Sequence, residues 1–260
     1  MKFETLDQFT ADLKQAVNYK YPFCTVSIGD GEAMFLLDVP YNEPNATNGV
    51  LHNHSELEDQ IKNDTLNMLP TADYIFAVPW NEEEAIKTRA SNIVWMQNIY
   101  SYEYILAMIR SNYKLANLFD RYHMSYSGHL FGAMPGARVV LVGHHAPDVL
   151  KLYYKSEVFR RYYTYSGIND VNIIDAIPCN KTHSILEVDG IVNYLQQTKD
   201  SYDVAIVSIG IPANYVCLKV KEFGKIAIDL GQGMTALAGY PDLRREHMEH
   251  YLIRSEITDV

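Results

Sequence analysis

The distribution of apolar residues along the chain predicts an alternation of strands and helices. Six short apolar runs end at or near glycine or proline, and they cover residues 23–28, 74–78, 138–142, 171–176, 204–209 and 225–230. The last four are separated by stretches of helical periodicity. Strands this apolar are typical of a parallel sheet that is covered on both faces. The sequence therefore predicts an α/β, Rossmann-like fold with a mostly parallel sheet and helices on both faces.

Helical periodicity accounts for most of the remaining chain. The apolar residues Leu6, Phe9, Leu13 and Val17 recur at helical spacing. Further helices are expected to begin at residue 33 and to cover residues 56–69, most of 82–126, 147–161, 182–196 and 213–223. No repeat, linker or low-complexity segment divides the sequence, so residues 1–260 are expected to form a single domain.

The loops that follow the strands are expected to meet at one edge of the sheet. Right-handed crossovers place every such loop at the carboxyl edge, which is where open parallel sheets bind ligands. The loops in question cover residues 29–32, 79–81, 143–145, 178–181, 210–212 and 231–233. The sequence therefore predicts one binding cleft built from these segments.

The sharpest local motif is Gly29-Asp30-Gly31-Glu32, directly after the first apolar run. Two carboxylates at this spacing can serve a hard divalent cation, which commonly takes one or two carboxylates together with water and phosphate oxygens. The alternative is structural: Asp30 caps the following helix, and Glu32 lies in the first turn, where the helix dipole favours a negative charge. Local pattern alone leaves both interpretations open.

Two other turns could contact a ligand. Gly210, Ile211 and Pro212 lie between a strand and a helix, where backbone N–H groups can bind a phosphate. Gly143 and His144 occupy the equivalent position after another strand. A tight turn and a histidine that merely positions the loop are the corresponding structural alternatives.

Composition narrows the class of partner. With 22 basic against 32 acidic side chains, the net charge of −10 argues against nucleic acid as the main partner. No run approaches the roughly 18 apolar residues of a membrane span, and the N-terminus does not look like a signal peptide. We therefore expect a cytoplasmic protein. Its three cysteines, Cys24, Cys179 and Cys217, are expected to be buried free thiols.

Three segments resemble the GT-D type glycosyltransferases. SIGDGEA at 27–33 matches the family's GDGE signature, while 138–143 and 204–232 resemble its middle strand and its closing β-α-β unit. The resemblance implies transfer of a hexose from a UDP-sugar to a hydroxyl of a glycan or glycoprotein acceptor. It is compatible with assembly into a homo-oligomer. It also implies that Asp30 and Glu32 serve a Mn²⁺ or Mg²⁺ ion and the donor diphosphate. The residues expected to line the nucleotide-sugar cleft are Gly29, Gly31, Gly143, His144, Gly210, Ile211 and Pro212.

The sequence departs from the family pattern at two places. Ser27 stands where the family often has an arginine, and residues 231–234 read Gly-Gln-Gly-Met instead of a Gly-His-Ile-Asp-like stretch. Three residues are therefore candidates, by position, for the general base that deprotonates the acceptor hydroxyl: Asp229, Asp175 and His144. Asp229 is also predicted, together with Asp30 and Glu32, to be a catalytic residue.

Two other functions compete with a glycosyltransferase. A nucleotide-sugar-binding or partner protein without catalysis is the first rival, because of the change at 231–234. An S-adenosylmethionine-dependent methyltransferase, which also has a glycine-bearing turn and an acidic residue after its first strand, is the second.

Overall fold

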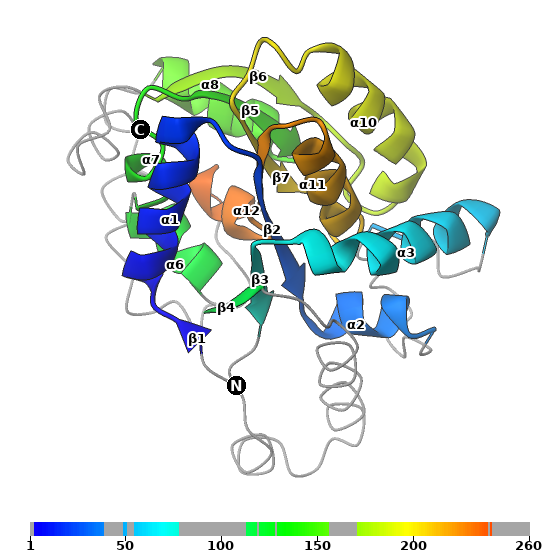
Figure 1. Ribbon diagram of the computed structural model, residues 1–260. Coiled ribbons are helices and arrows are strands. Elements are labelled where there is room, and N and C mark those ends of the chain that lie inside the picture. The colour runs from blue at the N-terminus through cyan, green and yellow to red at the C-terminus, as the bar shows by residue number, and fades with distance from the viewer. Residues whose placement is uncertain are drawn as a thin grey trace.

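The computed structural model describes residues 3–38, 49–50, 55–77, 113–118, 120–127, 129–155, 171–238 and 240. Within these ranges eight strands form one sheet in the order β1-β4-β3-β2-β8-β7-β5-β6, and all neighbouring pairs are parallel (Figure 1). The strands are β1 (Phe3–Glu4), β2 (Phe23–Ile28), β3 (Tyr74–Ala77), β4 (Lys114–Asn117), β5 (Arg138–Gly143), β6 (Asn172–Ile177), β7 (Val204–Ser208) and β8 (Ile226–Asp229). The predicted α/β fold with a parallel sheet is confirmed.

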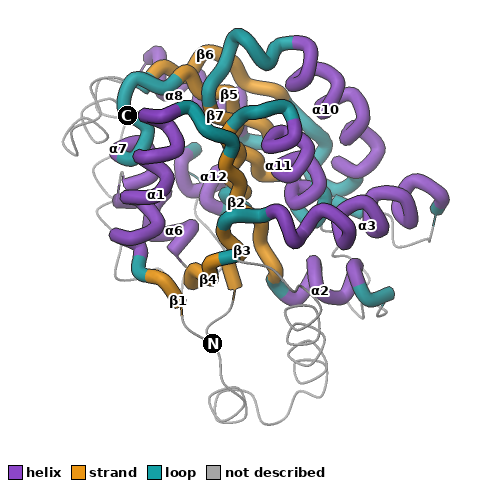
Figure 2. Tube along the Cα trace, in the orientation of Figure 1, coloured by secondary structure: helices purple, strands orange, loops and turns teal. Residues whose placement is uncertain are grey.

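Helices cover both faces of the sheet (Figure 2). One face carries α2 (Asp30–Leu36), α3 (Glu56–Met68), α10 (Val188–Gln197) and α11 (Ala213–Glu222). The other carries α1 (Leu6–Tyr19), α6 (Asp120–Ser127), α7 (His129–Gly132), α8 (Ala146–Lys155) and α12 (Gly233–Leu237). Two short 3₁₀ segments, η1 (Leu69–Thr71) and η2 (Ser184–Glu187), complete the described helices.

The apolar strands divide their side chains between two cores. In β2, Val26 and Ile28 belong to the core beneath α11, whereas Phe23 belongs to the core beneath α1. Both cores exclude water, so a central strand needs apolar residues at successive positions instead of an alternating pattern. This explains why the strands are visible as continuous apolar runs. Cys24, Cys179 and Cys217 are buried free thiols, as expected.

Some element boundaries differ from the predictions. Residues 114–117 form β4 rather than part of a long helix, because Leu115 and Ala116 face opposite cores and the strand is too short to show a period. Four short elements, β1, β4, α7 and α12, are additions to the predicted set. Three predicted segments lie outside the described residues: the loop 79–81, the part of the predicted helix 82–126 that precedes residue 113, and the end of the predicted helix 147–161.

A crevice opens between β2 and β8. Their pairing ends at Thr25 and Ile228, although β2 continues to Ile28. The side chain of Asn214, at the start of α11, takes the place of the missing strand: its Oδ1 accepts the Ser27 N–H at 2.8 Å, and its Nδ2 donates to the Ser27 carbonyl at 2.7 Å. The two strands then continue into helices on opposite faces, α2 and α12. This is the switch point at which open parallel sheets bind ligands.

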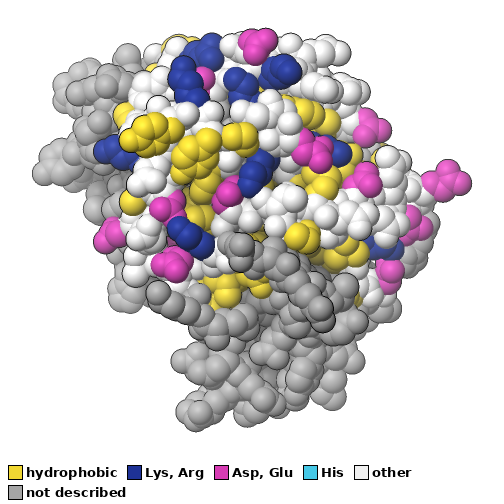
Figure 3. Space-filling view, in the orientation of Figure 1, with side chains coloured by type: hydrophobic (Ala, Val, Ile, Leu, Met, Phe, Trp, Pro, Cys, Tyr) yellow, Lys and Arg dark blue, Asp and Glu magenta, His cyan; other side chains and the backbone are white. Residues whose placement is uncertain are grey.

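The outer surface is mixed in charge. On the face shown in Figure 3, basic and acidic side chains are interspersed around small apolar groups. No helix in the described ranges combines the length and the apolar character that crossing a bilayer requires.

Candidate functional site

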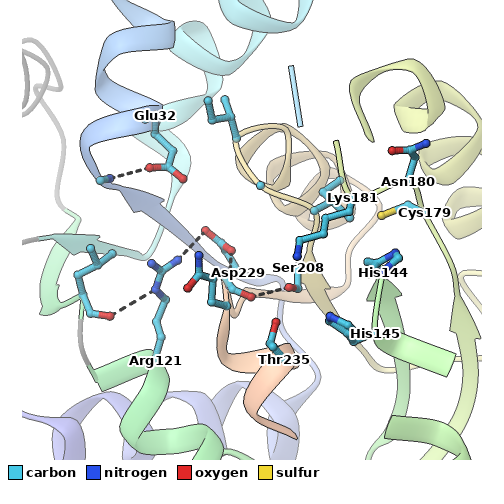
Figure 4. Close-up of a pocket in the computed structure, with 18 residues that line it drawn as sticks. Glu32, Arg121, His144, His145, Cys179, Asn180, Lys181, Ser208, Asp229 and Thr235 are labelled. Atoms are coloured by element: carbon cyan, nitrogen blue, oxygen red, sulfur yellow. Dashed lines mark hydrogen bonds and ion pairs between the residues drawn. The ribbon is translucent and has the colours of Figure 1, made fainter. Parts of the chain in front are cut away.

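A cavity of about 190 Å³ lies at the carboxyl edge of the sheet, over the crevice between β2 and β8. Its walls come from the turns after β2, β5, β6, β7 and β8 and from α6 and α12 (Figure 4). The predicted convergence of strand-end loops is therefore what the structure shows for the described loops.

Most of the residues singled out from the sequence line this cavity. They are Gly29, Gly31, Glu32, His144, Gly210, Ile211 and Asp229. Gly143 and Pro212 are not among the lining residues: Gly143 packs against the backbone of Ser208, and Pro212 is the N-cap of α11. Asp30 is the first residue of α2, and its side chain lies outside the description.

The motif after β2 builds the start of α2. Gly29 is the N-cap, and Glu32 Oε2 accepts the Gly29 N–H at 3.0 Å. The N-cap position considered for Asp30 thus belongs to Gly29, and Glu32 supplies the second half of a capping box by accepting the N–H of the N-cap residue. The same carboxylate lines the cavity, so its structural role does not remove it from the site.

The site can be tested for a divalent cation from its donor atoms. The described residues contain no cluster of three or more histidine, cysteine, aspartate or glutamate side chains that could hold a metal ion. A carboxylate has about four lone-pair positions, so Glu32 can accept the Gly29 N–H and still bind a cation. Mg²⁺ and Mn²⁺ need one or two carboxylates when phosphate and water supply the other oxygens. The carboxylate of Glu32 therefore fits an ion that binds together with a phosphorylated ligand.

A buried ion pair forms the floor of the cavity. Arg121 from α6 places Nη1 3.3 Å from Oδ2 of Asp229, and the two side chains are 8% and 4% exposed. Arg121 Nη1 also donates to the Ser27 hydroxyl at 2.5 Å. The other carboxylate oxygen of Asp229 accepts the Gly231 N–H at 2.9 Å. Asp229 is therefore held on both oxygens, and its charge is matched by that of Arg121.

Gly231 leaves the space that the guanidinium occupies. Its φ is +51°, and a Cβ at this position would lie 2.5 Å from Arg121 Nη1. A side chain here would be strained and would also displace the arginine.

The opposite wall is rich in nitrogen side chains. His144 and His145 follow β5, and Lys181 follows β6 (Figure 4). The pKa of His145 is lowered mainly by burial and further by the charges of His144 and Lys181, although Asp148 at 3.3 Å opposes this. The neutral form of His145 is therefore favoured, and Asp148 orients its ring.

Two residues that line the cavity and one that supports it were not singled out from the sequence. Arg121 lies in a stretch read as ordinary helix, and Lys181 was included only as the end of a predicted cleft loop. Asn214, which holds the end of β2, lies near the start of the predicted helix 213–223. No spacing or motif marks any of them. Their roles depend on which elements become neighbours in space.

Comparison with known proteins places the chain in a family. A family model described as the GT-D fold-like domain matches residues 5–237. A solved structure described as a new glycosyltransferase (DUF1792) from Streptococcus sanguinis shares 12% identity, with coverage of 89% of this chain and 81% of that chain and a TM-score of 0.57.

A second structure, described as the highly conserved domain of unknown function 1792 with a distinct glycosyltransferase fold, shares 13% identity. The structural match covers 87% of this chain and 80% of that chain, with a TM-score of 0.56. No curated protein matches the sequence. At these identities the structural likeness shows the fold, while the family match covers most of the sequence. The chain belongs to the GT-D fold-like domain family.

Proposed function

We propose that this protein is a glycosyltransferase that moves a hexose from a UDP-sugar to a hydroxyl group of a glycan or glycoprotein. The observation that carries the proposal is the position of Glu32, which belongs to the D-x-E motif and lines the cavity at the switch point of the sheet. Membership of the GT-D fold-like domain family supports the same activity.

Asp30 and Glu32 would hold a Mn²⁺ or Mg²⁺ ion in this proposal. Such an ion, when bound, neutralises negative charge on a departing diphosphate. Glu32 is already fixed by the Gly29 N–H, so its carboxylate is ordered before any ligand binds.

The rest of the donor site would come from groups that favour anions. Gly210 and Ile211 line the cavity at the N-terminal end of the ten-residue helix α11, where the helix dipole attracts negative charge. Across the cavity, Arg121 is held in place by Asp229 and Ser27. These contacts would position the leaving diphosphate without any movement of the backbone.

His144 is the best placed of the three candidate bases. Asp229 lines the cavity but has both carboxylate oxygens engaged, by Arg121 and by the Gly231 N–H. Asp175 is not among the lining residues, and it accepts the Tyr194 hydroxyl at 2.6 Å. His144 is exposed and lines the cavity. We therefore assign proton acceptance from the acceptor hydroxyl to His144, and we assign to Asp229 the positioning of Arg121.

Thermal unfolding with ligands tests the donor site. A nucleotide at 100 times its Kd stabilises a protein by about 2.7 kcal/mol, which for a domain of this size raises Tm by roughly 5–10 °C. UDP and UDP-glucose with Mn²⁺ should produce this shift in the wild type, and Asp30→Asn and Glu32→Gln should lose it. Glu56→Gln changes an exposed glutamate in the first turn of α3 and should retain the shift. A flat response to all nucleotides, with stabilisation by S-adenosylmethionine, would refute the proposal and favour a methyltransferase.

Catalysis needs a separate measurement, because the engagement of Asp229 also suits a protein that binds a nucleotide-sugar without turnover. Release of UDP from UDP-glucose, with and without glycan acceptors, distinguishes the two. His144→Gln should abolish release while leaving the UDP-induced Tm shift unchanged. Binding without release in the wild type, across UDP-hexoses and acceptors, would favour the non-catalytic function.

A further inference from the structure

Two cationic side chains that line the cavity, those of Arg121 and Lys181, differ in their burial and in their ionic partners. Arg121 is buried and its charge is balanced by Asp229. Lys181 is exposed, and no hydrogen bond or ion pair involving its ammonium group occurs within the described part of the chain. Its side chain extends into the cavity above Ser208 (Figure 4). Lys181 therefore lines the cavity with an ammonium group that is accessible to a ligand.

The loop that carries Lys181 has a fixed shape. The Oδ1 of Asn180 accepts three hydrogen bonds, from the Thr182 N–H at 2.9 Å, the Thr182 hydroxyl at 2.8 Å and the His183 N–H at 3.2 Å. The Asn180 N–H itself donates to Glu187 Oε1 at 3.1 Å. Lys181 lies inside this network, so the loop does not need to be ordered when a ligand binds, and the cost of binding is reduced accordingly.

The charges around the cavity are arranged in two poles. The carboxylate of Glu32 lies on the side of β2, and Lys181 lies on the far side with His144 and His145 (Figure 4). Between them the Arg121–Asp229 pair is neutral overall. An anionic group would therefore be attracted to the Lys181 side and repelled by Glu32 unless a cation lay between.

We propose that Lys181 binds the phosphate oxygens of the donor diphosphate, on the side of the cavity opposite the D-x-E motif. This inference rests on the proposed function and adds a binding residue that the motif does not contain. The diphosphate then lies between a metal-binding pole at Glu32 and a lysine at the opposite pole. Lys181 acts as a point charge with three donors, which suits phosphate oxygens whose exact orientation varies.

Calorimetric titration of the full chain tests this proposal. The ligands are UDP, UDP-glucose, UDP-glucuronate, uridine and inorganic pyrophosphate, each with Mn²⁺ and at constant ionic strength. Lys181→Met keeps most of the aliphatic stem but removes the charge, and it should weaken UDP and pyrophosphate binding about tenfold or more. Uridine binding should not change. Lys181→Arg should restore most of the lost affinity. Lys199→Met, which alters an exposed lysine beyond α10, is the matched control and should bind like the wild type.

The outcomes separate this inference from the proposed function. Wild type and Lys181→Met binding UDP equally would overturn the role of Lys181 and leave the donor site standing. If the wild type binds pyrophosphate but neither UDP nor UDP-glucose, and Lys181→Met abolishes the pyrophosphate binding, Lys181 belongs to an anion site and the proposed UDP-sugar donor is refuted. A wild type that binds neither pyrophosphate nor UDP would overturn both. A weakening seen with UDP-glucuronate but not with UDP would assign Lys181 to a sugar carboxylate and refute the phosphate contact.

Discussion

The buried ion pair between Arg121 and Asp229 should make the site fragile to loss of either partner alone. Breaking a buried pair by removing one partner typically costs about 3–5 kcal/mol, because the remaining charge is left without compensation. Arg121→Met preserves much of the stem, but Asp229 then keeps the Gly231 N–H without the guanidinium. We expect a loss near 3 kcal/mol in the free energy of unfolding, since that N–H remains and water can enter from the cavity.

Removing both charges should be less costly than removing one. In Arg121→Met/Asp229→Asn no charge is left buried, so the double variant should recover about 2 kcal/mol relative to Arg121→Met. Equilibrium urea unfolding of the four proteins at pH 7 gives the coupling energy directly. Each variant must unfold with an unchanged m-value for the comparison to hold.

The pair formed by Arg138 and Asp203 provides the matched control. It has a shorter contact, 2.9 Å, but its side chains are 41% and 22% exposed. Exposed pairs contribute about 0–1 kcal/mol, so Arg138→Met should cost far less than Arg121→Met. The reasoning fails if the two arginine variants lose equal stability, or if Asp229→Asn does not rescue Arg121→Met.

Three further substitutions test other parts of the structure. Asn214→Ala leaves two buried backbone groups of β2 without partners and should lower the free energy of unfolding by about 2–4 kcal/mol in urea. Gly231→Ala should lower Tm more than Gly224→Ala does. Both glycines have a positive φ, but an added Cβ at 231 would meet Arg121, whereas a Cβ at 224 would meet no atom within 4 Å. Equal losses of Tm would contradict the close contact at 231. Burial raises the pKa of Asp120 to about 6. The unfolded chain keeps the ordinary pKa of 3.8, so stability is lost as pH rises from about 3.8 to about 6. Asp120→Asn should therefore raise stability by about 1 kcal/mol at pH 8, after allowance for screening by water, by about half as much at pH 5, and not at all at pH 3.

The carboxyl edge of the sheet could be predicted because its determinants are local. Each long strand is a continuous apolar run that ends in a turn, and parallel topology then fixes where the turns meet. The position of Glu32 in the cavity follows from its place directly after β2. The structural alternative, in which Asp30 caps α2, placed the N-cap one residue too far along: the N-cap is Gly29, which has no side chain, and its N–H is satisfied by Glu32 from the helix itself.

The cations of the site could not be predicted because they depend on tertiary neighbours. Arg121 becomes part of the site only because α6 packs against the turn after β8, which lies 108 residues further along the chain. The loop that carries Lys181 was predicted to line the cleft, but the sequence did not single out its lysine, whose place in the loop depends on the hydrogen bonds of the Asn180 side chain. The short strand β4 was assigned to a helix for a similar reason, since its four residues are specified by pairing with β3 rather than by their own pattern.

The two departures from the family pattern have a common physical basis in α6. The serine at position 27 suggested that a guanidinium was missing beside the motif, yet Arg121 brings one to within 2.5 Å of the Ser27 hydroxyl. Ser125, one turn further along α6, lies so close to Gly233 that an added Cβ there would be 2.3 Å from its hydroxyl. The absence of a side chain at Gly233 therefore leaves room for Ser125, and the absence of one at Gly231 leaves room for the guanidinium of Arg121. Both glycines belong to the altered 231–234 stretch, so this stretch provides space for the helix that carries the buried cation of the cavity.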